Sequence, residues 1–355
     1  MSEAIRINRA ASRKPRPKDS ELGFGQVFTD HMFLMDFQEE KGWYDPRIEP
    51  YGPLHLDPAT SFLHYGQGLF EGLKAFRGRD GKIRLFRPQK HVERLNRTAQ
   101  RMCIPPIDPE LVLRSWTTLV DLDRDWVPSS LGHSLYIRPT VIASEPFLGV
   151  RPAKQYLYFV ILSPVGAYYP EGMNPVRIKV IDRYVRAVPG GLGEAKTAAN
   201  YAASLYAAEE AKHEGFTQVL WLDGVHRRYI EEVGTMNIMM RIGDTVVTPP
   251  LAGTILPGVT RDSALTLLRE WGWRVEERPV TIDEGRDAAR AGTLREVWGT
   301  GTAAVISPVG ELAYRDERIV VNDFQIGELT HRLYDAIVGV QYGTAPDRHG
   351  WTLEV

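Results

Sequence analysis

A segment rich in glycine and proline near the middle of the chain constrains the fold more than any other feature. Residues Val165–Pro175, with the sequence VGAYYPEGMNP, interrupt both helix and strand patterns, and such clusters mark connections between folded parts. A chain of 355 residues is also too long for one hydrophobic core. We therefore predict two domains, a smaller one at residues 1–165 with a basic N-terminal arm and a larger one at residues 176–355, joined by a linker at residues 166–175.

Both halves mix strand and helix patterns. Strands are predicted at Lys82–Phe86, Ser134–Arg138, Tyr156–Leu162 and Val176–Ile181, and helices at about Pro88–Met102, Pro109–Leu122, Ala198–Glu214 and Thr260–Trp271. The first of these helices carries Val92, Leu95, Ala99 and Met102 on one apolar face. Such a mixture within each half indicates an α+β fold rather than a doubly wound sheet.

Charge and cysteine content exclude several classes of protein. The net charge is −2 and the pI about 6.5, so the chain has no general attraction to nucleic acid or acidic membranes. No apolar run is long enough to span a membrane. The single cysteine, Cys103, cannot form an intramolecular disulfide, which fits a reducing compartment, and we expect the cytoplasm rather than the mitochondrial matrix. Its apolar neighbours, Met102 and Ile104, favour a buried thiol.

A lysine and a carboxylate in the second half suggest chemistry. Lys196 lies between the glycine-rich Pro189–Gly193 and an alanine-rich helix, and the sequence EEVGTMN at Glu231–Asn237 follows a strand-like run at Gln218–Asp223. A carboxylate at a strand end beside a glycine suits a cationic ring nitrogen, and a lysine can form a Schiff base. Together they match the protein half of a pyridoxal-phosphate enzyme. In isolation, each is more often a solvated surface charge.

Two segments offer sites for an anion. The turn at Gly258 leads into a helix for which Thr260 is a good N-cap, and the N–H groups of a first helical turn bind anions. Arg94 lies off the apolar face of its helix and could supply a fixed positive charge. A capped helix start usually binds nothing, so this segment alone carries little weight.

The glycine-rich Gly299–Ala304 superficially resembles a dinucleotide fingerprint. That fingerprint should open a helix, whereas Val305–Pro308 looks like a strand stopped by its proline. We therefore expect a turn that presents N–H groups and the Thr302 hydroxyl to an anion. No Walker sequence, nucleophile elbow or zinc-protease motif occurs, and the histidines show no metal-ligand spacing, so no metal site is predicted.

These residues occur in an order that resembles a known family. The relevant segments are Phe28–Met32, His64–Tyr65, Leu69–Phe76, Leu85–Pro88, Ser134–Pro139, Glu145–Val150, Pro164–Tyr168, Gln218–Trp221, Glu232–Asn237 and Leu256–Arg261. With Arg94, Lys196 and Thr302 among them, the chain from about Leu22 to its C-terminus resembles the class IV pyridoxal-phosphate aminotransferases and, more narrowly, the branched-chain amino acid aminotransferases. Where some animal relatives carry a Cys-x-x-Cys redox pair, this chain has Ala304 and Ser307.

The resemblance implies roles for individual residues. Lys196 would be the Schiff-base lysine and the proton carrier, Glu232 would hold the pyridinium nitrogen, Tyr201 would bond the phenolic oxygen, and Arg94, Val259, Thr260 and Thr302 would hold the phosphate of pyridoxal 5′-phosphate. Thr235, Ala303 and Ala304 would receive the substrate α-carboxylate, while Phe70, Tyr136 and Tyr168 would wall the side-chain pocket. Tyr65, Leu148 and Val150 would come from the second subunit of a homodimer, and Arg138 would bind the distal carboxylate of glutamate or 2-oxoglutarate.

The implied reaction is ping-pong transamination of leucine, isoleucine and valine with 2-oxoglutarate, with the cofactor in the cleft between the two domains. The nearest alternative is another class IV enzyme, a D-amino acid aminotransferase or an aminodeoxychorismate lyase, against which the pocket residues Phe70, Tyr136, Arg138 and Tyr168 weigh. A nicotinamide-dependent oxidoreductase using Gly299–Ala304 and a non-catalytic binding protein are alternatives from other classes. A yellow protein whose absorbance shifts with leucine and reverts with a 2-oxo acid fits only an aminotransferase.

Overall fold

The computed structural model describes residues 4–166 and 173–355. The chain forms two compact units, one of residues 1–168, 195–198 and 339–355 and the other of residues 169–194 and 199–338. This division differs from the predicted domains in two places. The short segment around Lys196 and the C-terminal residues both belong to the first unit, because they hydrogen-bond to its strands and helices.

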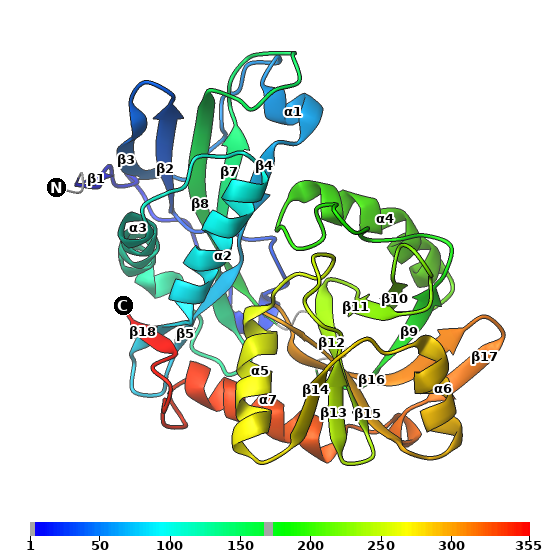
Figure 1. The fold of residues 1–355 in the computed structure, drawn as a ribbon. Helices are drawn as coiled ribbons and strands as arrows, with labels where there is room; N and C mark the ends of the chain where they lie inside the picture. The colour runs from blue at the N-terminus through cyan, green and yellow to red at the C-terminus, as the bar shows by residue number, and fades with distance from the viewer. Residues whose placement is uncertain (1–3, 167–172) are drawn as a thin grey trace. The chain divides into compact units, whose positions relative to one another are not determined.

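The first unit is built on a nine-stranded, largely antiparallel sheet (Figure 1). Its strands run in the order β1-β3-β2-β8-β7-β5-β6-β18, and β4 pairs with β7. Their bounds are β1 Arg6–Ile7, β2 His31–Gln38, β3 Gly42–Pro50, β4 Gly68–Phe70, β5 Leu73–Arg77, β6 Ile83–Phe86, β7 Ser134–Ala143, β8 Gln155–Val165 and β18 Thr352–Glu354. Within the described residues of this sheet, the pairing of β1 with β3 is the one parallel pairing.

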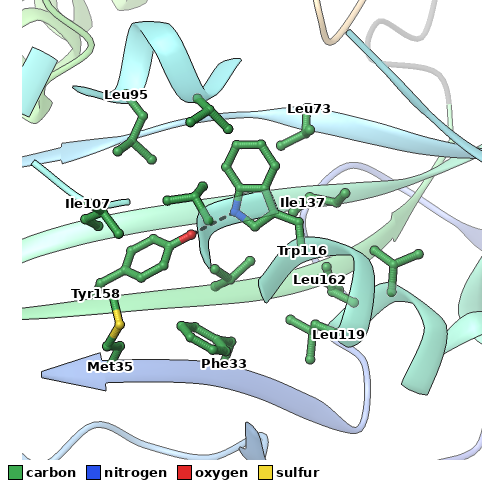
Figure 2. Close-up of a cluster of buried hydrophobic side chains, with 14 of the residues drawn as sticks. Phe33, Met35, Leu73, Leu95, Ile107, Trp116, Leu119, Ile137, Tyr158 and Leu162 are labelled. Carbon is green, nitrogen blue, oxygen red and sulfur yellow. Dashed lines mark hydrogen bonds between the residues drawn. The ribbon is translucent and has the colours of Figure 1, made fainter. Parts of the chain in front are cut away.

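Two helices, α2 (Pro88–Arg101) and α3 (Pro109–Leu122), pack beside this sheet (Figure 1). Proline at the first helical position begins each of them, as expected from its fixed φ. Their apolar faces bury Leu95 and Trp116 against strand residues, and the Trp116 indole donates a hydrogen bond of 2.8 Å to the Tyr158 hydroxyl (Figure 2). The unit also contains the short helix α1 (Ser61–Tyr65) and the 3-10 turns η1 (Asp19–Glu21) and η2 (Arg124–Trp126).

The second unit holds another nine-stranded sheet, in the order β11-β10-β9-β16-β15-β12-β13-β14 with β17 paired to β16. The bounds are β9 Val176–Ile181, β10 Gln218–Leu222, β11 Ile230–Val233, β12 Met236–Ile242, β13 Thr245–Thr248, β14 Arg274–Glu277, β15 Leu294–Gly301, β16 Val305–Tyr314 and β17 Glu317–Val320. Because β11 also pairs with β12, six of these strands close into a ring. The ring brings the β11–β12 hairpin beside β15.

Helices of the second unit cover this sheet. Their bounds are α4 Ala198–His213, α5 Val259–Glu270, α6 Ile282–Arg290, α7 Glu328–Gln341 and the 3-10 turn η3 Asn322–Phe324. Helix α4 packs Ala207 and Ala211 against strand residues such as Trp221. Together with the first unit, this arrangement confirms the predicted α+β class. Within the described residues no helix is long and apolar enough to cross a bilayer.

Two local predictions were wrong. Cys103 is exposed, because it lies in the left-handed turn that follows α2, with φ of 54°, so its side chain does not join its apolar neighbours. Pro308 does not stop its strand, since β16 continues to Tyr314. Pro308 pairs with Trp298 of β15, but β9 joins β16 only from Val309. A strand tolerates a residue without an N–H where it has a neighbour on one side only.

Candidate active site

The backbone around Lys196 is fixed within the first unit. The Lys196 N–H donates to the Thr98 hydroxyl of α2 at 3.1 Å, and its carbonyl accepts from the Phe70 N–H of β4 at 3.0 Å. The next residue, Thr197, donates its hydroxyl to the Gly68 carbonyl at 2.7 Å. These bonds attach the segment to β4 and α2 just before α4 begins.

The Lys196 side chain has an environment suited to a reactive amine. It is half-buried, and its Nζ lies 4.9 Å from the centre of the Phe70 ring. Burial and, to a smaller extent, the Arg94 guanidinium lower the pKa of the Lys196 ammonium, the Glu71 carboxylate opposes them, and the net pKa is about 8. A larger fraction of this amine is therefore neutral near pH 8 than for an ordinary lysine.

Arg94 is buried on the side of α2 beside the apolar stripe of Val92, Leu95 and Ala99, and its guanidinium is a fixed positive charge. Only 4% of it is exposed. Its Nε and Nη2 donate to the two carboxylate oxygens of Glu71 at 2.7 and 2.8 Å, and His91 contacts the same carboxylate at 2.9 Å. Sequence patterns missed this because the counter-charge lies 23 residues away on the chain.

Three of the predicted pocket residues lie together in the first unit. The Arg138 guanidinium carbon lies 4.8 Å from the Phe70 ring centre and 5.1 Å from that of Tyr136, and its Nη2 donates to the Tyr136 hydroxyl at 3.1 Å. A Cβ at Gly72 would lie 1.9 Å from the Tyr136 hydroxyl, so this close packing requires glycine. The cluster combines aromatic surface with one cation.

The residues expected from a second subunit occupy an exposed part of the first unit. The Tyr65 hydroxyl donates to the Leu148 carbonyl. Their side chains are about half exposed, and Val150 is 87% exposed. The contacts that Tyr65, Leu148 and Val150 make within this chain do not place them in a pocket. The remaining predicted wall residue, Tyr168, lies outside the described residues.

In the second unit, Glu232 is buried on β11 and held by three partners. Its Oε2 pairs with Arg186 Nε at 2.9 Å, while its Oε1 accepts from Asn237 Nδ2 at 3.0 Å and from the Leu256 N–H at 3.1 Å. Asn237 also donates to the Leu256 carbonyl at 2.9 Å. The carboxylate is therefore fixed in position and orientation.

Neither Arg186 nor Asn237 was predicted to have a role in the site. A signal for Asn237 was present, because the two-residue turn Gly234-Thr235 between β11 and β12 places Glu232 directly opposite it. Arg186 contacts Glu232 from a position before the glycine-rich loop, and no local pattern connects the two residues.

The adjacent carboxylate, Glu231, is buried as well. It accepts a 2.5 Å hydrogen bond from the Thr254 hydroxyl, and the Arg186 guanidinium also donates to the Thr254 carbonyl. Burial raises the pKa of the Glu231 carboxyl, and the bond from Thr254 opposes this rise. Neither acidic residue is an exposed strand end.

Helix α5 begins at Val259, and its N-cap is Gly258, two residues before the predicted N-cap Thr260. A Cβ at Gly258 would lie 2.0 Å from Asn237 Oδ1, and only glycine allows this approach. Val259 and Thr260 are buried in the first helical turn, and the N–H groups of such a turn can bind an anion. The helix start and the carboxylate of Glu232 share Asn237 as a support.

The other predicted residues of the second unit have more exposed positions. Thr302, Ala303 and Ala304 form the half-buried turn between β15 and β16, which confirms the predicted turn for these residues, whereas Gly299–Gly301 belong to strand β15. Thr235 is exposed in the β11–β12 turn, and Tyr201 is half-buried in the first turn of α4. The described residues contain no cluster of histidine, cysteine and acidic side chains able to hold a metal ion.

Comparison with known proteins gives consistent matches over nearly the whole chain. The family model described as amino-transferase class IV matches residues 68–312. Branched-chain-amino-acid aminotransferase 2 of Bacillus subtilis (strain 168) is 54% identical, over 99% of this chain and 97% of that protein. The branched-chain-amino-acid aminotransferase of Mycolicibacterium smegmatis is 47% identical over 93% of this chain and 91% of that protein.

Solved structures give the same match at the level of the fold. The branched-chain amino acid aminotransferase of Escherichia coli superposes with a TM-score of 0.75 and 25% identity, covering 91% of this chain and 98% of that one. The Thermobaculum terrenum enzyme of the same name, in its PLP form, superposes with a TM-score of 0.73 at 20% identity, covering 93% and 99%.

Proposed function

This chain belongs to the class IV aminotransferase family, and on that premise we propose that it transfers the amino group of leucine, isoleucine or valine to 2-oxoglutarate with pyridoxal 5′-phosphate as cofactor. The observation that carries the proposal is Lys196, an amine of lowered pKa that lies against Phe70 of the Phe70–Tyr136–Arg138 cluster. Curated relatives that cover nearly the whole chain are named for the same reaction.

The chemistry of the side chains fits this cofactor. Lys196 offers an amine for covalent attachment, and Glu232 offers a fixed carboxylate for a ring nitrogen. The start of α5 lies close to Asn237 because residue 258 has no Cβ, and the N–H groups of a first helical turn are typical ligands of a phosphate. When bound, pyridoxal phosphate supplies the electron-accepting ring through which an amino group leaves one substrate and reaches another.

Each residue then has a defined task. Lys196 Nζ removes and returns the proton on the substrate Cα, and a pKa near 8 suits both directions near neutral pH. Glu232 keeps a proton on the ring nitrogen, and Arg186 and Asn237 hold the carboxylate in place. The proposed phosphate ligands are Arg94, Val259, Thr260 and Thr302, with Tyr201 at the phenolic oxygen.

The substrate side chain is proposed to lie against Phe70 and Tyr136. These rings favour an isobutyl group, and three carbons at ~0.8 kcal/mol each predict a preference for leucine over alanine of roughly sixtyfold in kcat/KM. Arg138 binds the distal carboxylate of the acidic partner. We further propose that Thr235, Ala303 and Ala304 receive the α-carboxylate, and that a homodimer supplies Tyr65, Leu148 and Val150 to each pocket.

A two-step absorbance experiment tests this proposal. The purified full-length chain, loaded with pyridoxal phosphate, should change its cofactor spectrum on addition of L-leucine and recover it on addition of 2-oxoglutarate. Lys196→Ala should slow both spectral changes by ~10²-fold or more. It should also lose borohydride-dependent cofactor labelling in mass spectrometry. Lys212→Ala, at an exposed position of α4, should behave like the wild type.

Two results would contradict the proposal. A Lys196→Ala variant that kept a tenth of the wild-type rate would show that another lysine carries the chemistry. A response to D-amino acids alone, or release of pyruvate without transamination, would assign the chain to another class IV activity.

A further inference from the structure

Glu71 is a fully buried carboxylate for which the proposed chemistry has no direct use. It directly follows β4 and has 0% exposure. Burial alone would raise the pKa of the Glu71 carboxyl, but the Arg94 guanidinium and His91 outweigh that effect and hold this pKa well below its usual range. A charged group in this position needs a reason, because desolvating an ion is costly.

The bonds between Glu71 and Arg94 determine the orientation of the guanidinium. Two parallel hydrogen bonds of 2.7 and 2.8 Å join one edge of Arg94 to both oxygens of Glu71, and such a fork fixes the plane of the group. The carboxylate is itself held, since its Oε2 also contacts His91 Nδ1 at 2.9 Å and accepts from the Gly72 N–H at 3.2 Å.

The same elements hold Lys196. Thr98, which receives the Lys196 N–H, lies one helical turn after Arg94 on α2. Phe70, which donates to the Lys196 carbonyl, immediately precedes Glu71. The charged and titratable groups near the Lys196 amine are Arg94, Glu71, Arg138, Tyr136 and His91. Arg94 and Glu71 are therefore held against the segment that carries the reactive amine.

We propose that Glu71 is a positioning residue for the cofactor phosphate, which holds the Arg94 guanidinium in the direction that binding requires. This inference rests on the proposed function, in which Arg94 is a phosphate ligand. A buried anion beside the binding cation weakens its attraction for phosphate through charge alone. The role of Glu71 is therefore to fix geometry at some electrostatic cost.

Two substitutions separate position from charge. Glu71→Asp keeps the charge but shortens the side chain by one methylene, so Arg94 loses its fixed place. Glu71→Gln keeps the length but removes the charge and points an amide N–H₂ at the guanidinium. Pyridoxal 5′-phosphate is titrated into each cofactor-depleted full-length variant, and the dissociation constant is measured by absorbance. Both variants should bind the cofactor roughly tenfold more weakly than the wild type.

Glu296→Gln is the matched control. Glu296 is a buried carboxylate of the second unit, 4% exposed, that accepts from Arg241 at 3.1 Å and from the Thr330 hydroxyl at 2.7 Å. Losing its charge should lower the melting temperature without changing the cofactor dissociation constant of the folded protein. The control shows whether damage to any buried ion pair is enough to weaken cofactor binding.

A double-mutant cycle tests whether Glu71 acts through Arg94. In an Arg94→Lys background the guanidinium fork is absent, so Glu71→Asp should weaken cofactor binding by less than twofold further. A purely structural role predicts additive losses instead.

A second readout is the pH dependence of cofactor attachment to Lys196. It should move to lower pH in Glu71→Gln, which loses a charge that raises this lysine's pKa, and stay in place in Glu71→Asp.

The alternatives give different results. If Glu71 were only a counter-charge, Glu71→Asp would bind the cofactor like the wild type and Glu71→Gln would bind it more tightly, and either result overturns the proposal. If Glu71→Gln does not fold, the cofactor affinity of Glu71→Asp and the double-mutant cycle with Arg94→Lys still test the proposal. A wild-type chain that binds no pyridoxal phosphate contradicts the proposed function, whereas normal binding with no effect of either Glu71 variant contradicts this inference alone.

Discussion

Arg138 contacts both aromatic residues that are proposed to wall the substrate pocket. Its guanidinium lies over Phe70 and Tyr136 and donates to the Tyr136 hydroxyl. Cation–π contacts and one hydrogen bond hold the Arg138 guanidinium, and none of these contacts involves a carboxylate. The cation is thereby available to an acidic substrate, while an aliphatic substrate meets mainly the ring surfaces.

This arrangement predicts a selective defect. Arg138→Gln should slow the half-reaction with glutamate by ten- to a hundredfold, the loss of about 1.5–3 kcal/mol expected for one charged hydrogen bond, and leave the leucine half-reaction within twofold. Single-turnover absorbance with each amino acid measures both. Arg177→Gln is the control, because Arg177 lies 5.5 Å from the Phe216 ring in the second unit. Equal loss in both half-reactions would make Arg138 a structural residue.

Lys74 gives a prediction for stability against pH. It is buried on β5, opposite Tyr136 of β7, and burial lowers the pKa of its ammonium from 10.5 to about 8. The unfolded chain therefore binds more protons between these two pH values, so this group makes stability rise with pH across that window. The difference between the unfolded and folded pKa values of Lys74 corresponds to roughly 3 kcal/mol of destabilisation of the folded chain below pH 8.

Lys74→Met should therefore flatten the rise in stability between about pH 8 and 10.5 and stabilise the chain most at pH 7. Urea unfolding at pH 7, 9 and 10 measures the effect. Lys82→Met, at an exposed position just before β6, should change stability by less than about 0.5 kcal/mol at each pH. Parallel pH profiles for the wild type and Lys74→Met would show that Lys74 is not desolvated.

At the scale of helices and strands, much of the structure follows from local patterns. Prolines at positions 88 and 109 begin α2 and α3 as predicted, because proline fits the first helical position whatever surrounds it. The start of α5 was misplaced because its N-cap depends on the contact between Gly258 and Asn237, which are distant in sequence.

The candidate site divides in the same way. Lys196 and Glu232 were found from residue types beside turns, whereas the supports Glu71 and Arg186 were missed. Each of these forms an ion pair between separate elements, and the short-range periodicity of a sequence carries no information about such pairs. The family resemblance identified the residues expected to touch the cofactor, and the structure adds the residues that hold them.

Packing between α3 and β8 predicts a local loss of stability. Tyr158→Phe removes the hydroxyl that accepts from the Trp116 indole at 2.8 Å (Figure 2) and leaves a buried N–H without this partner, which should cost about 1–3 kcal/mol. Urea unfolding followed by tryptophan fluorescence measures it. Tyr184→Phe, whose hydroxyl lies 3.5 Å from Glu210 and is only partly buried, should cost less than about 0.5 kcal/mol. Equal costs would contradict the role of the indole bond.

At the scale of the whole molecule, the first unit is assembled from both ends of the chain. Its C-terminal strand β18 pairs with β6, and the Val355 N–H donates to the Ile83 carbonyl at 3.0 Å. Trp351, just before β18, packs edge-to-face on Phe86 with ring centres 5.7 Å apart. Its carbonyl also accepts from the Arg87 N–H at the start of α2. The last five residues therefore support the helix that carries Arg94.

Deleting Trp351–Val355 should consequently destabilise the first unit. The loss of one buried tryptophan side chain alone is expected to cost about 3–5 kcal/mol. Hydrogen exchange followed by mass spectrometry should show faster exchange in β5, β6 and the first turn of α2, and unchanged exchange in β10 and β16, which belong to the other sheet. Glu354→Ala keeps the backbone pairing and removes only an exposed ion pair with Lys82, so it should exchange like the wild type. Uniformly faster exchange across both sheets would mean that the two units unfold together, and unchanged exchange in β6 would mean that β18 adds nothing to the stability of its neighbour.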